Sequence, residues 1–559
     1  MNKRALLSVY YKDGILDLAS FLAEAGWEIL STGGTSKYLS ENRISVIDVS
    51  SVTGFPECLD GRVKTLHPAI HAGLLARREM KAHMETLEKL NLQTIDLVCV
   101  NLYPFFEKVR LAAEGSSLEE IIEFVDIGGP SMLRSAAKNF HDVIVLTDQS
   151  DYGEVIAGLK AGNISRDFRK HLAGKVFSLT SAYDAAIARY LLELDNSGEG
   201  AEAVNSKAAY PAFWPISLKK AQDLRYGENN HQSAALYLHA DKGGALSGME
   251  QLHGKELGYN NIRDLDLAWK AVCAFGLPAG GIHSQGTDPV GEADVWRLVP
   301  AAGNTNRMAC CAAVKHNTPC GIALGNTLFE AYEKVFACDP VSIFGGIVAS
   351  NVTVDSATAE KLGELFLEIV VAPDFENDAL EILKKKKNLR IIKTTCTPND
   401  TKEYIAVDGG LLVQDIDRKL LEKWEVVTRA SPSGEDIPDL VFGLRAVTFV
   451  KSNAIMVVKN LAAVGIGGGE VNRIWPTLQA LERSVAAIKA GGPWADDKPA
   501  RVLASDAFFP FADVVESAAA AGIKAIIQPG GSINDKLSIE ACDRLGLAMV
   551  FTGTRHFKH

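Results

Sequence analysis

A lysine and a histidine stand side by side at Lys315 and His316, in a stretch that continues Asn-Thr-Pro-Cys-Gly. An ammonium group can stabilise a developing negative charge, and an imidazole can move a proton near neutral pH. The pair follows an apolar run from Cys310 to Val314, which is typical of a buried strand. Pro319 and Gly321 are expected to break that strand. The sequence therefore predicts that the pair lies on a turn at a strand end.

Two other interpretations of this stretch stay open from the residues alone. A strand end with a solvated lysine and a hydrogen-bonded histidine would have the same sequence. The zinc deaminases also carry a histidine followed by Pro-Cys, but their signature requires His-x-Glu and Pro-Cys-x-x-Cys. Here Asn317 and Thr318 follow His316, and Ala323 stands where the second cysteine would be. A zinc site is therefore not expected.

A second group of reactive side chains lies in a loop rich in glycine and proline. Arg62, Lys64, Thr65, His67 and His71 fall within this one short stretch. Such a loop can offer a guanidinium, an ammonium and a hydroxyl to a phosphorylated ligand. We expect a functional role for it.

A glycine-containing turn precedes this loop, in the sequence Ser-Thr-Gly-Gly-Thr-Ser-Lys from Ser31 to Lys37. Glycines let backbone N–H groups approach an anion, and the start of a helix favours negative charge. The turn lacks both the GxGxxG and the Walker A spacing, so a plain strand-to-helix turn remains an alternative.

The elements expected around these loops alternate between strands and helices. Ala5 to Val9 and Trp27 to Leu30 are typical of buried strands, and a helical pattern begins after Gly14. Ile95 to Val100 and Val143 to Leu146 predict two further strands. Such βαβ units imply a parallel sheet covered by helices, with ligands at the carboxyl ends of the strands.

Bulk properties bound the class of protein. The chain has 559 residues, a formal net charge of −11 and 47% hydrophobic residues, so several soluble domains are expected. The charge does not favour nucleic-acid binding, and neither a membrane span nor a signal peptide is expected. Nine scattered cysteines without CxxC pairs favour reduced thiols and a cytoplasmic location.

The motifs in order resemble one family along nearly the whole chain. The first region contains SxxxKxG, STGGT, TGFPExLDGRVKTLHP, NLYPF and DIGGPSMLRSAAKN. The second contains RYGENxHQ, KExxYNN, KHxxPCG, DPVSxFGG, VKSNAI, SDAFFPF, IIQPGGS and TxxRHF. Together they resemble the bifunctional purine-biosynthesis family, which joins phosphoribosylaminoimidazolecarboxamide (AICAR) formyltransferase to IMP cyclohydrolase.

The resemblance implies an α/β protein with two catalytic domains. Residues 1–196 would form a methylglyoxal-synthase-like domain with a doubly wound parallel sheet, which closes formylated AICAR (FAICAR) to IMP. A polar stretch, 197–207, would be the linker. Residues 208–559 would form a cytidine-deaminase-like α/β domain in two similar halves, which transfers a formyl group from 10-formyltetrahydrofolate to AICAR.

For ring closure, the resemblance implies catalytic roles for Lys64, Tyr103, Asp126 and Lys138. The FAICAR and IMP pocket would be formed by Ser8, Lys12, Thr32, Gly33, Gly34, Thr35, Arg62, Val63, Thr65, Asn101 and Ile127. The family usually has Ser-Asp where this chain has Tyr10 and Tyr11, which puts side-chain contacts there in question.

For formyl transfer, the resemblance makes Lys315 and His316 the catalytic pair. AICAR would also contact Arg225, Tyr226, Gly345, Glu368, Asn453, Arg473, Asp513 and Arg555. The folate would bind near Ile474, Phe508, Ser532 and Ile533. Asn472 replaces the usual serine, and residues 277–308 form an unfamiliar segment before the catalytic strand.

The family's folate is a cosubstrate, so no catalytic metal is implied, and a structural monovalent cation stays open. The family forms homodimers with sites shared between copies. The partners expected are therefore small-molecule substrates and a second copy of the chain, with no nucleic acid and no membrane. A non-catalytic nucleotide sensor is the alternative from another class, and the intact Lys315–His316 pair argues against it.

Overall fold

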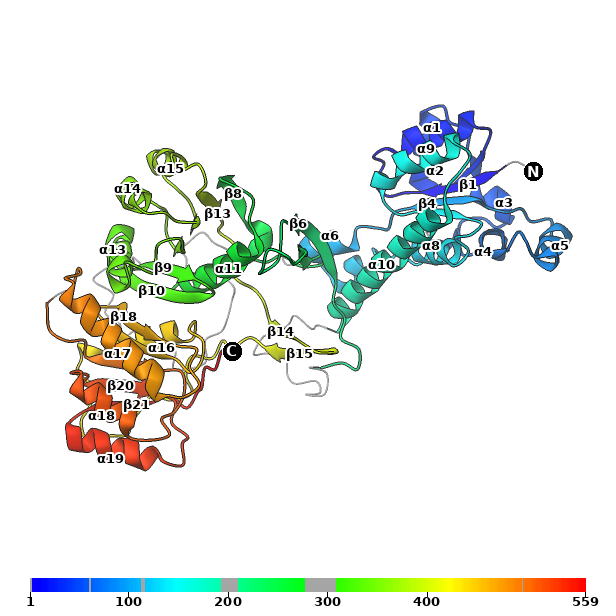
Figure 1. Cartoon of the computed structure of the whole chain (residues 1–559). Coiled ribbons are helices and arrows are strands. Elements are labelled where there is room, and N and C mark those ends of the chain that lie inside the picture. Colours follow the sequence, from blue (N-terminus) through cyan, green and yellow to red (C-terminus); the bar gives the residue numbers. More distant parts are fainter. Residues whose placement is uncertain (1–2, 60–61, 112–115, 193–209, 277–307, 495) are drawn as a thin grey trace. The chain divides into compact units, whose positions relative to one another are not determined.

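The chain folds into two compact units in the computed structural model, which describes residues 3–59, 62–111, 116–192, 210–276, 308–494 and 496–559. The first unit contains the described residues up to 192, residues 210–219 and His239–Lys242 (Figure 1). The second unit contains the rest. The expected linker, 197–207, and the unfamiliar segment up to residue 307 lie outside the described residues. Within the described part of the chain, none of the helices has the length and apolar character that a membrane crossing requires.

The first unit is built on a sheet in the order β3-β2-β1-β4-β5, and all neighbouring strands are parallel. Its strands are β1 (Arg4–Ser8), β2 (Glu28–Ser31), β3 (Ile47–Asp48), β4 (Leu97–Val100) and β5 (Ile144–Leu146). They are short and apolar because helices cover both faces, as parallel sheets require. The doubly wound parallel sheet expected from the sequence is confirmed.

The helices of the first unit flank this sheet, with α1 and α9 on one side and α8 and α10 on the other (Figure 1). They are α1 (Ile15–Glu24), α2 (Gly33–Glu41), α3 (Val49–Thr53), α4 (Pro68–Leu75), α5 (Lys81–Lys89), α6 (Phe105–Leu111), α7 (Leu118–Ile122), α8 (Gly128–Lys138), α9 (Tyr152–Lys160) and α10 (Arg166–Leu191). A single core cluster packs between helices and sheet.

The second unit contains one sheet in the order β16-β21-β20-β19-β17-β18-β10-β9-β11-β12-β13-β8. Its strands are β8 (Glu250–His253), β9 (Ala309–Lys315), β10 (Thr318–Gly325), β11 (Ile347–Ser350), β12 (Ile369–Ala372), β13 (Arg390–Lys393), β16 (Glu425–Val426), β17 (Ile455–Lys459), β18 (Ala462–Gly467), β19 (Val502–Ser505), β20 (Ala525–Gln528) and β21 (Ala548–Phe551). Read from either edge, the sheet has the same arrangement of parallel and antiparallel strands. Each half has a central antiparallel hairpin, three further parallel strands and an antiparallel edge strand.

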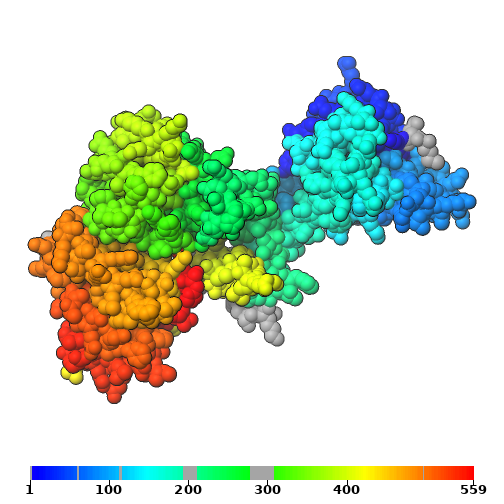
Figure 2. All heavy atoms as spheres, viewed as in Figure 1, coloured from blue at the N-terminus to red at the C-terminus, as the bar shows by residue number. Residues whose placement is uncertain are grey.

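The two similar halves expected from the sequence are therefore present, and they meet where β10 pairs with β18. In Figure 2 the green first half and the orange-to-red second half pack against each other. Their helices are α11 (Tyr259–Cys273), α13 (Leu328–Cys338), α14 (Ser356–Glu364), α15 (Asn377–Lys384), α16 (Asp436–Val447), α17 (Ile474–Lys489), α18 (Asp513–Ala520) and α19 (Asp535–Leu545).

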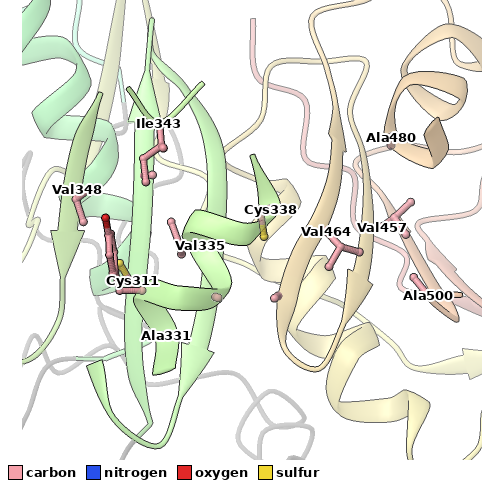
Figure 3. Packing of buried hydrophobic residues seen from close by; sticks show 14 of the residues in the cluster. Cys311, Ala331, Val335, Cys338, Ile343, Val348, Val457, Val464, Ala480 and Ala500 are labelled. Carbon is pink, nitrogen blue, oxygen red and sulfur yellow. The ribbon is translucent and has the colours of Figure 1, made fainter. Parts of the chain in front are cut away.

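Each face of this sheet carries its own core. Along β9, Cys311 and Ala313 pack in one cluster and Cys310 and Ala312 in the other. The first cluster joins both halves: Figure 3 shows Cys311 and Val335 together with Val464 of β18. Helices α11 and α16 contribute to the second cluster. Burial on both sides explains why β9 is apolar at every position rather than at alternate ones.

The chain after His316 differs from the sequence prediction. Pro319 and Gly321 do not end a strand; they lie inside β10, which pairs with β9 as a hairpin. The turn consists of His316 and Asn317, with φ of 56° and 55°. The pairing register shifts between Pro319 and Gly321, and such a bulge accommodates a proline that has no N–H to donate.

The remaining strands form two small ribbons: β6 (Leu218–Leu224) with β7 (Ala234–His239), and β14 (Lys402–Val407) with β15 (Gly410–Asp415). The pairing of β14 with β15 is antiparallel.

Candidate active sites

A cavity of about 330 Å³ opens at the carboxyl ends of β1, β2 and β4 in the first unit. This is where a doubly wound sheet binds ligands. Its lining includes ten of the residues predicted for the first site: Ser8, Lys12, Thr32, Gly34, Thr35, Lys64, Thr65, Asn101, Tyr103 and Asp126. The tertiary structure thus brings together segments that are far apart in the sequence.

One wall of this cavity is the N-terminus of α2. Its N-cap residue, Thr32, makes no side-chain capping hydrogen bond, so the first N–H groups of the helix are open to a ligand. The hydroxyl of Thr35 instead bonds to the backbone of Val9, and the Lys12 ammonium lies 3.2 Å from that hydroxyl. Burial lowers the pKa of Lys12. A helix start beside a half-buried ammonium favours the binding of an anion such as a phosphate.

The opposite wall carries a carboxyl group, Asp126, at the start of α8. Burial raises its pKa, and hydrogen bonds from Gly129 and Tyr103 together with the charge of Lys64 oppose that shift. The N–H of Gly129 donates to Asp126 Oδ1 at 2.8 Å. A Cβ on Gly129 would lie 2.4 Å from Asp126 Oδ2, so glycine is needed for this close approach. Asp126 and Lys64 can therefore exchange protons with a ligand held between them.

Tyr10 lines the cavity and Tyr11 follows it in the chain, where the family usually has Ser-Asp. Asn101 holds their backbone: its Oδ1 accepts the N–H of Tyr11 at 3.1 Å and its Nδ2 donates to the Tyr11 carbonyl at 3.2 Å. The Tyr10 ring packs edge-to-face on Tyr103 at 5.9 Å. The Tyr11 hydroxyl donates to Glu107 at 2.6 Å. The Asn101 side chain thus fixes the backbone at Tyr11, while Tyr10 makes an aromatic contact with Tyr103.

Five predicted residues of the first site are not part of the cavity lining, and one of them is Gly33, the first residue of α2. Arg62 is exposed and forms an ion pair with Glu123. Ile127 is 58% exposed, and Val63 forms an isolated bridge with Cys58. Lys138 is exposed at the last position of α8, at the opposite end of the helix from Asp126. The position of Lys138 in one chain therefore does not support its predicted proton transfer in this cavity.

A cavity of about 270 Å³ lies beside Lys315 and His316 in the second unit. It is lined by Lys315, His316, Thr318, Pro319, Cys320, Cys338, Asp339, Ser342, Ala463, Gly465, Ile466 and Arg483. The eight residues up to 342 belong to the first half, and the other four belong to the second. Lys315 and His316 therefore lie where the two halves meet.

Lys315 is half-buried and His316 is exposed. The Lys315 ammonium donates to the carbonyl of Phe344 at 2.7 Å, next to Gly345, whose φ is 73°. Glu368 lies at the start of the neighbouring β12 and pairs with Arg390 at 2.6 Å. Lys315, Gly345 and Glu368 thus lie around the strand ends of the first half. The imidazole of His316 beside them is exposed.

A second group of predicted residues lies in the second half and does not line this cavity. Arg473 is buried and donates to the side chains of Asn453, at 2.6 Å, and Asp506. Asn453 Nδ2 donates to the carbonyl of Glu470 at 2.9 Å. The guanidinium of Arg473 is therefore engaged within the protein and fixes Asn453.

The remaining predicted residues are spread over exposed or half-buried positions. Arg225 lies 5.7 Å from the Tyr226 ring and Arg555 lies 4.4 Å from the Phe557 ring. Asp513 begins α18, and of the predicted folate residues Ile474 begins α17, Phe508 is 36% exposed and Ile533 fully exposed, with Ser532 beside it. None of them lines the cavity at His316 within the described part of the chain.

One residue of the site escaped sequence reasoning. Asp264 of α11 accepts the N–H of His316 at 3.1 Å and the N–H of Asn317. The signal was present as an internal repeat: Asp264 begins Asp-Leu-x-x-x-x-Lys-Ala-Val, and Asp439 begins Asp-Leu-x-x-x-x-Arg-Ala-Val. No group of three or more His, Cys, Asp or Glu side chains suited to a metal occurs among the described residues.

Comparison with known proteins gives consistent matches. A family model described as the AICARFT/IMPCHase bienzyme matches residues 136–483, and one described as an MGS-like domain matches residues 14–131. The chain is 54% identical over 560 residues to "Bifunctional purine biosynthesis protein PurH" of Clostridium acetobutylicum, covering 100% of both chains. It is equally similar to the protein of that name from Fusobacterium nucleatum subsp. nucleatum, at 54% identity and 100% coverage of both. A solved structure titled "Crystal structure of ForH" is 36% identical and covers 34% of this chain and 97% of that one, with a TM-score of 0.31.

Proposed function

The chain belongs to the AICARFT/IMPCHase bienzyme family, and from this premise we propose how its two units divide the chemistry. It is a bifunctional enzyme of purine biosynthesis that formylates AICAR and closes the product, FAICAR, to IMP. We assign ring closure to the cavity of the first unit and formyl transfer to the turn at Lys315 and His316.

In ring closure, the carboxamide nitrogen of FAICAR attacks its formyl carbon, a C–N bond forms and water leaves. The nucleotide phosphate would bind the N-terminus of α2 beside Lys12. Asp126, with its pKa raised by burial, would accept the proton of the attacking nitrogen. Lys64 and Tyr103 would donate to the formyl oxygen as it becomes the departing water.

In formyl transfer, the AICAR amine attacks the formyl carbon of 10-formyltetrahydrofolate. A tetrahedral intermediate forms, and the bond from that carbon to the folate nitrogen then breaks. His316 would take the proton from the amine, and Lys315 would stabilise the oxyanion or protonate the leaving nitrogen. Base assistance matters because the electrons of the amine are delocalised into the ring.

A homodimer would complete the second site. The predicted nucleotide and folate residues form separate groups in one chain, and none outside the first half lines the cavity at His316 in the part that the structure describes. Large apolar side chains around both groups are exposed, including Phe344 at 55%, Trp475 at 49% and Phe511 at 59%. A second copy could cover them and bring the groups together.

A cytoplasmic location is proposed on the state of the cysteines. All nine are free thiols, and Cys99, Cys310, Cys311, Cys338 and Cys542 are buried. Such thiols are typical of a reducing compartment.

The observation that carries the assignment of formyl transfer is the exposed imidazole of His316, on a turn beside an ammonium and a cavity. The test measures both reactions on one preparation, with AICAR plus 10-formyltetrahydrofolate for the first and FAICAR for the second. We expect His316→Ala to lower formyl transfer by about a hundredfold or more and to leave ring closure intact. His171→Ala, at an exposed position on α10, is the control. Near-normal formyl transfer by His316→Ala would exclude the assignment.

A further inference from the structure

The catalytic turn is held by a carboxylate that comes from another element. His316 and Asn317 connect β9 to β10, and both have positive φ. Asp264, on α11, accepts both of their N–H groups: Oδ2 from His316 at 3.1 Å and Oδ1 from Asn317 at 2.5 Å. One carboxylate therefore fixes the two residues whose backbone direction aims the imidazole.

The turn needs such a partner because of its conformation. A two-residue hairpin turn with positive φ at both positions favours Asn-Gly or Gly-Gly. An ordinary side chain in the left-handed region costs about 1–2 kcal/mol per residue. His316 carries such a side chain, and Asn317 is better suited to the region but not as free as glycine. The two charge-assisted hydrogen bonds that the Asp264 carboxylate accepts from these N–H groups offset this cost.

The second half of the unit repeats the arrangement without the histidine. Asn460 and Leu461, with φ of 54° and 58°, connect β17 to β18. Asp439 of α16 accepts their N–H groups at 3.0 and 2.7 Å. Lys459, the counterpart of Lys315, is buried and bonded to Asp496 at 2.7 Å. The second half therefore has the same turn and carboxylate, but its lysine is bonded to Asp496 inside the protein.

The repeat can be followed in the sequence. Val314-Lys315 and Val458-Lys459 precede the two turns, and Gly321-Ile322 and Gly465-Ile466 follow at the same spacing. The carboxylate is thus part of the shared hairpin scaffold, and the first half has placed a reactive imidazole on it.

We propose that Asp264 is a positioning residue for formyl transfer, which acts by holding the Lys315–His316 turn in its strained conformation. It touches the backbone of the turn and no imidazole nitrogen in the contacts of the structure. The proposal rests on the assignment of His316 as the base. It predicts an effect on the rate of the chemical step rather than on substrate affinity.

The experiment compares Asp264→Asn with Asp439→Asn. The second variant makes the same change at the turn of the second half, which has no histidine. Asparagine keeps the size but replaces one acceptor oxygen with an NH₂ group facing an N–H. We expect Asp264→Asn to lower kcat for formyl transfer roughly tenfold to a hundredfold, as misplacement of a reacting group does, with little change in KM for AICAR. Asp439→Asn should lower thermal stability to a similar degree and keep kcat within about twofold. Ring closure, measured on each preparation, reports that the chain is folded.

Rescue separates positioning from a general loss of structure. Asn317→Gly removes the conformational cost at one turn position, so it should restore part of the kcat lost in Asp264→Asn. If Asp264→Asn does not fold, Asp264→Glu keeps the charge, displaces the turn by one methylene and should lower kcat in the same way.

Wild-type kcat in Asp264→Asn or Asp264→Glu would overturn the proposal, as would an equal loss of kcat in Asp439→Asn or a loss confined to KM. If His316→Ala is active, the assigned function itself fails. If His316→Ala is inactive while Asp264→Asn is active, only the positioning role fails.

Discussion

Lys64 and Lys138 are both candidates for proton transfer in the first unit. Lys64 lines the cavity, and its Nζ lies 3.4 Å from where a Cβ on Gly33 would be. Lys138 matches the family motif but is exposed at the far end of α8. Proximity to the reacting atoms decides between them, because proton transfer requires hydrogen-bond reach.

Replacing each lysine by alanine tests this choice. We expect Lys64→Ala to lower kcat for ring closure about a hundredfold and Lys138→Ala to change it by less than about threefold. Formyl transfer is the internal control and should stay unchanged in both. A larger loss in Lys138→Ala than in Lys64→Ala would show that Lys138 reaches the substrate after all, for example from a second copy.

Tyr10 gives the second prediction at this scale. Its ring supports Tyr103 by an edge-to-face contact, worth about 1 kcal/mol. Tyr10→Ser, which restores the usual family residue, should therefore lower kcat for ring closure about fivefold. Tyr11→Phe removes only the hydrogen bond to Glu107 and is the matched control. A faster enzyme with Tyr10→Ser would mean that the ring obstructs the cavity instead.

At the scale of elements, α11 and α16 each deliver one carboxylate to one hairpin turn. The two sites differ in their surroundings. Burial raises the pKa of Asp439 to about 6; Asp436 adds to the shift, and the bonds to Leu461 and Asn460 and the charge of Lys334 oppose it. Asp439 therefore titrates within a range where the folded protein can be studied.

The sign of the resulting pH dependence follows from linkage. The folded state keeps a proton on Asp439 that the unfolded chain releases above its usual pKa of about 3.8. The stabilisation is fully present below that value and is lost as the pH rises through about 6. Asp439 should thus lower the free energy of unfolding by about 1 kcal/mol between pH 5 and 7.5.

Chemical denaturation at several pH values checks this, with loss of formyl transfer as the probe of the second unit. Asp439→Asn cannot titrate, so the difference between wild type and variant should shrink as the pH rises. A difference that grows with pH would contradict the raised pKa.

At the scale of the whole molecule, the proposed dimer makes a prediction about mixtures. His316 and Arg555 would act in one site but come from different copies, so neither His316→Ala nor Arg555→Ala should be active alone. Random exchange of the two variants would give mixed dimers with one intact site of two, and hence about a quarter of the wild-type activity.

Mixing after reversible dissociation, followed by a formyl-transfer assay, measures this recovery. Mixing His316→Ala with Lys315→Ala is the control, because both residues lie on one turn and no intact site can form. Absence of recovery in the first mixture, with dimers shown by sedimentation, would place both residues of each site in one chain.

The sequence by itself determined the α/β class, the family and the chemical groups available. Apolar runs bounded by glycine and proline identify buried strands such as β1, β4 and β9, because burial on both faces leaves a local signature. The family motifs are local as well. The dense loop around Lys64 and the pair at Lys315 and His316 could therefore be singled out without coordinates.

Only the tertiary structure decided which of these groups meet. Pro319 predicted a strand end, but pairing with β9 kept the chain extended, since a bulge removes the need for the missing N–H. Arg189 and Asp241 form a buried ion pair at 3.0 Å, and so His239–Lys242 packs with the first unit although the sequence placed it in the second domain. Lys138 was predicted from a motif and Asp264 was not predicted. In both cases the direction of the helix decides whether the side chain lies at the site, and only the tertiary structure shows that direction.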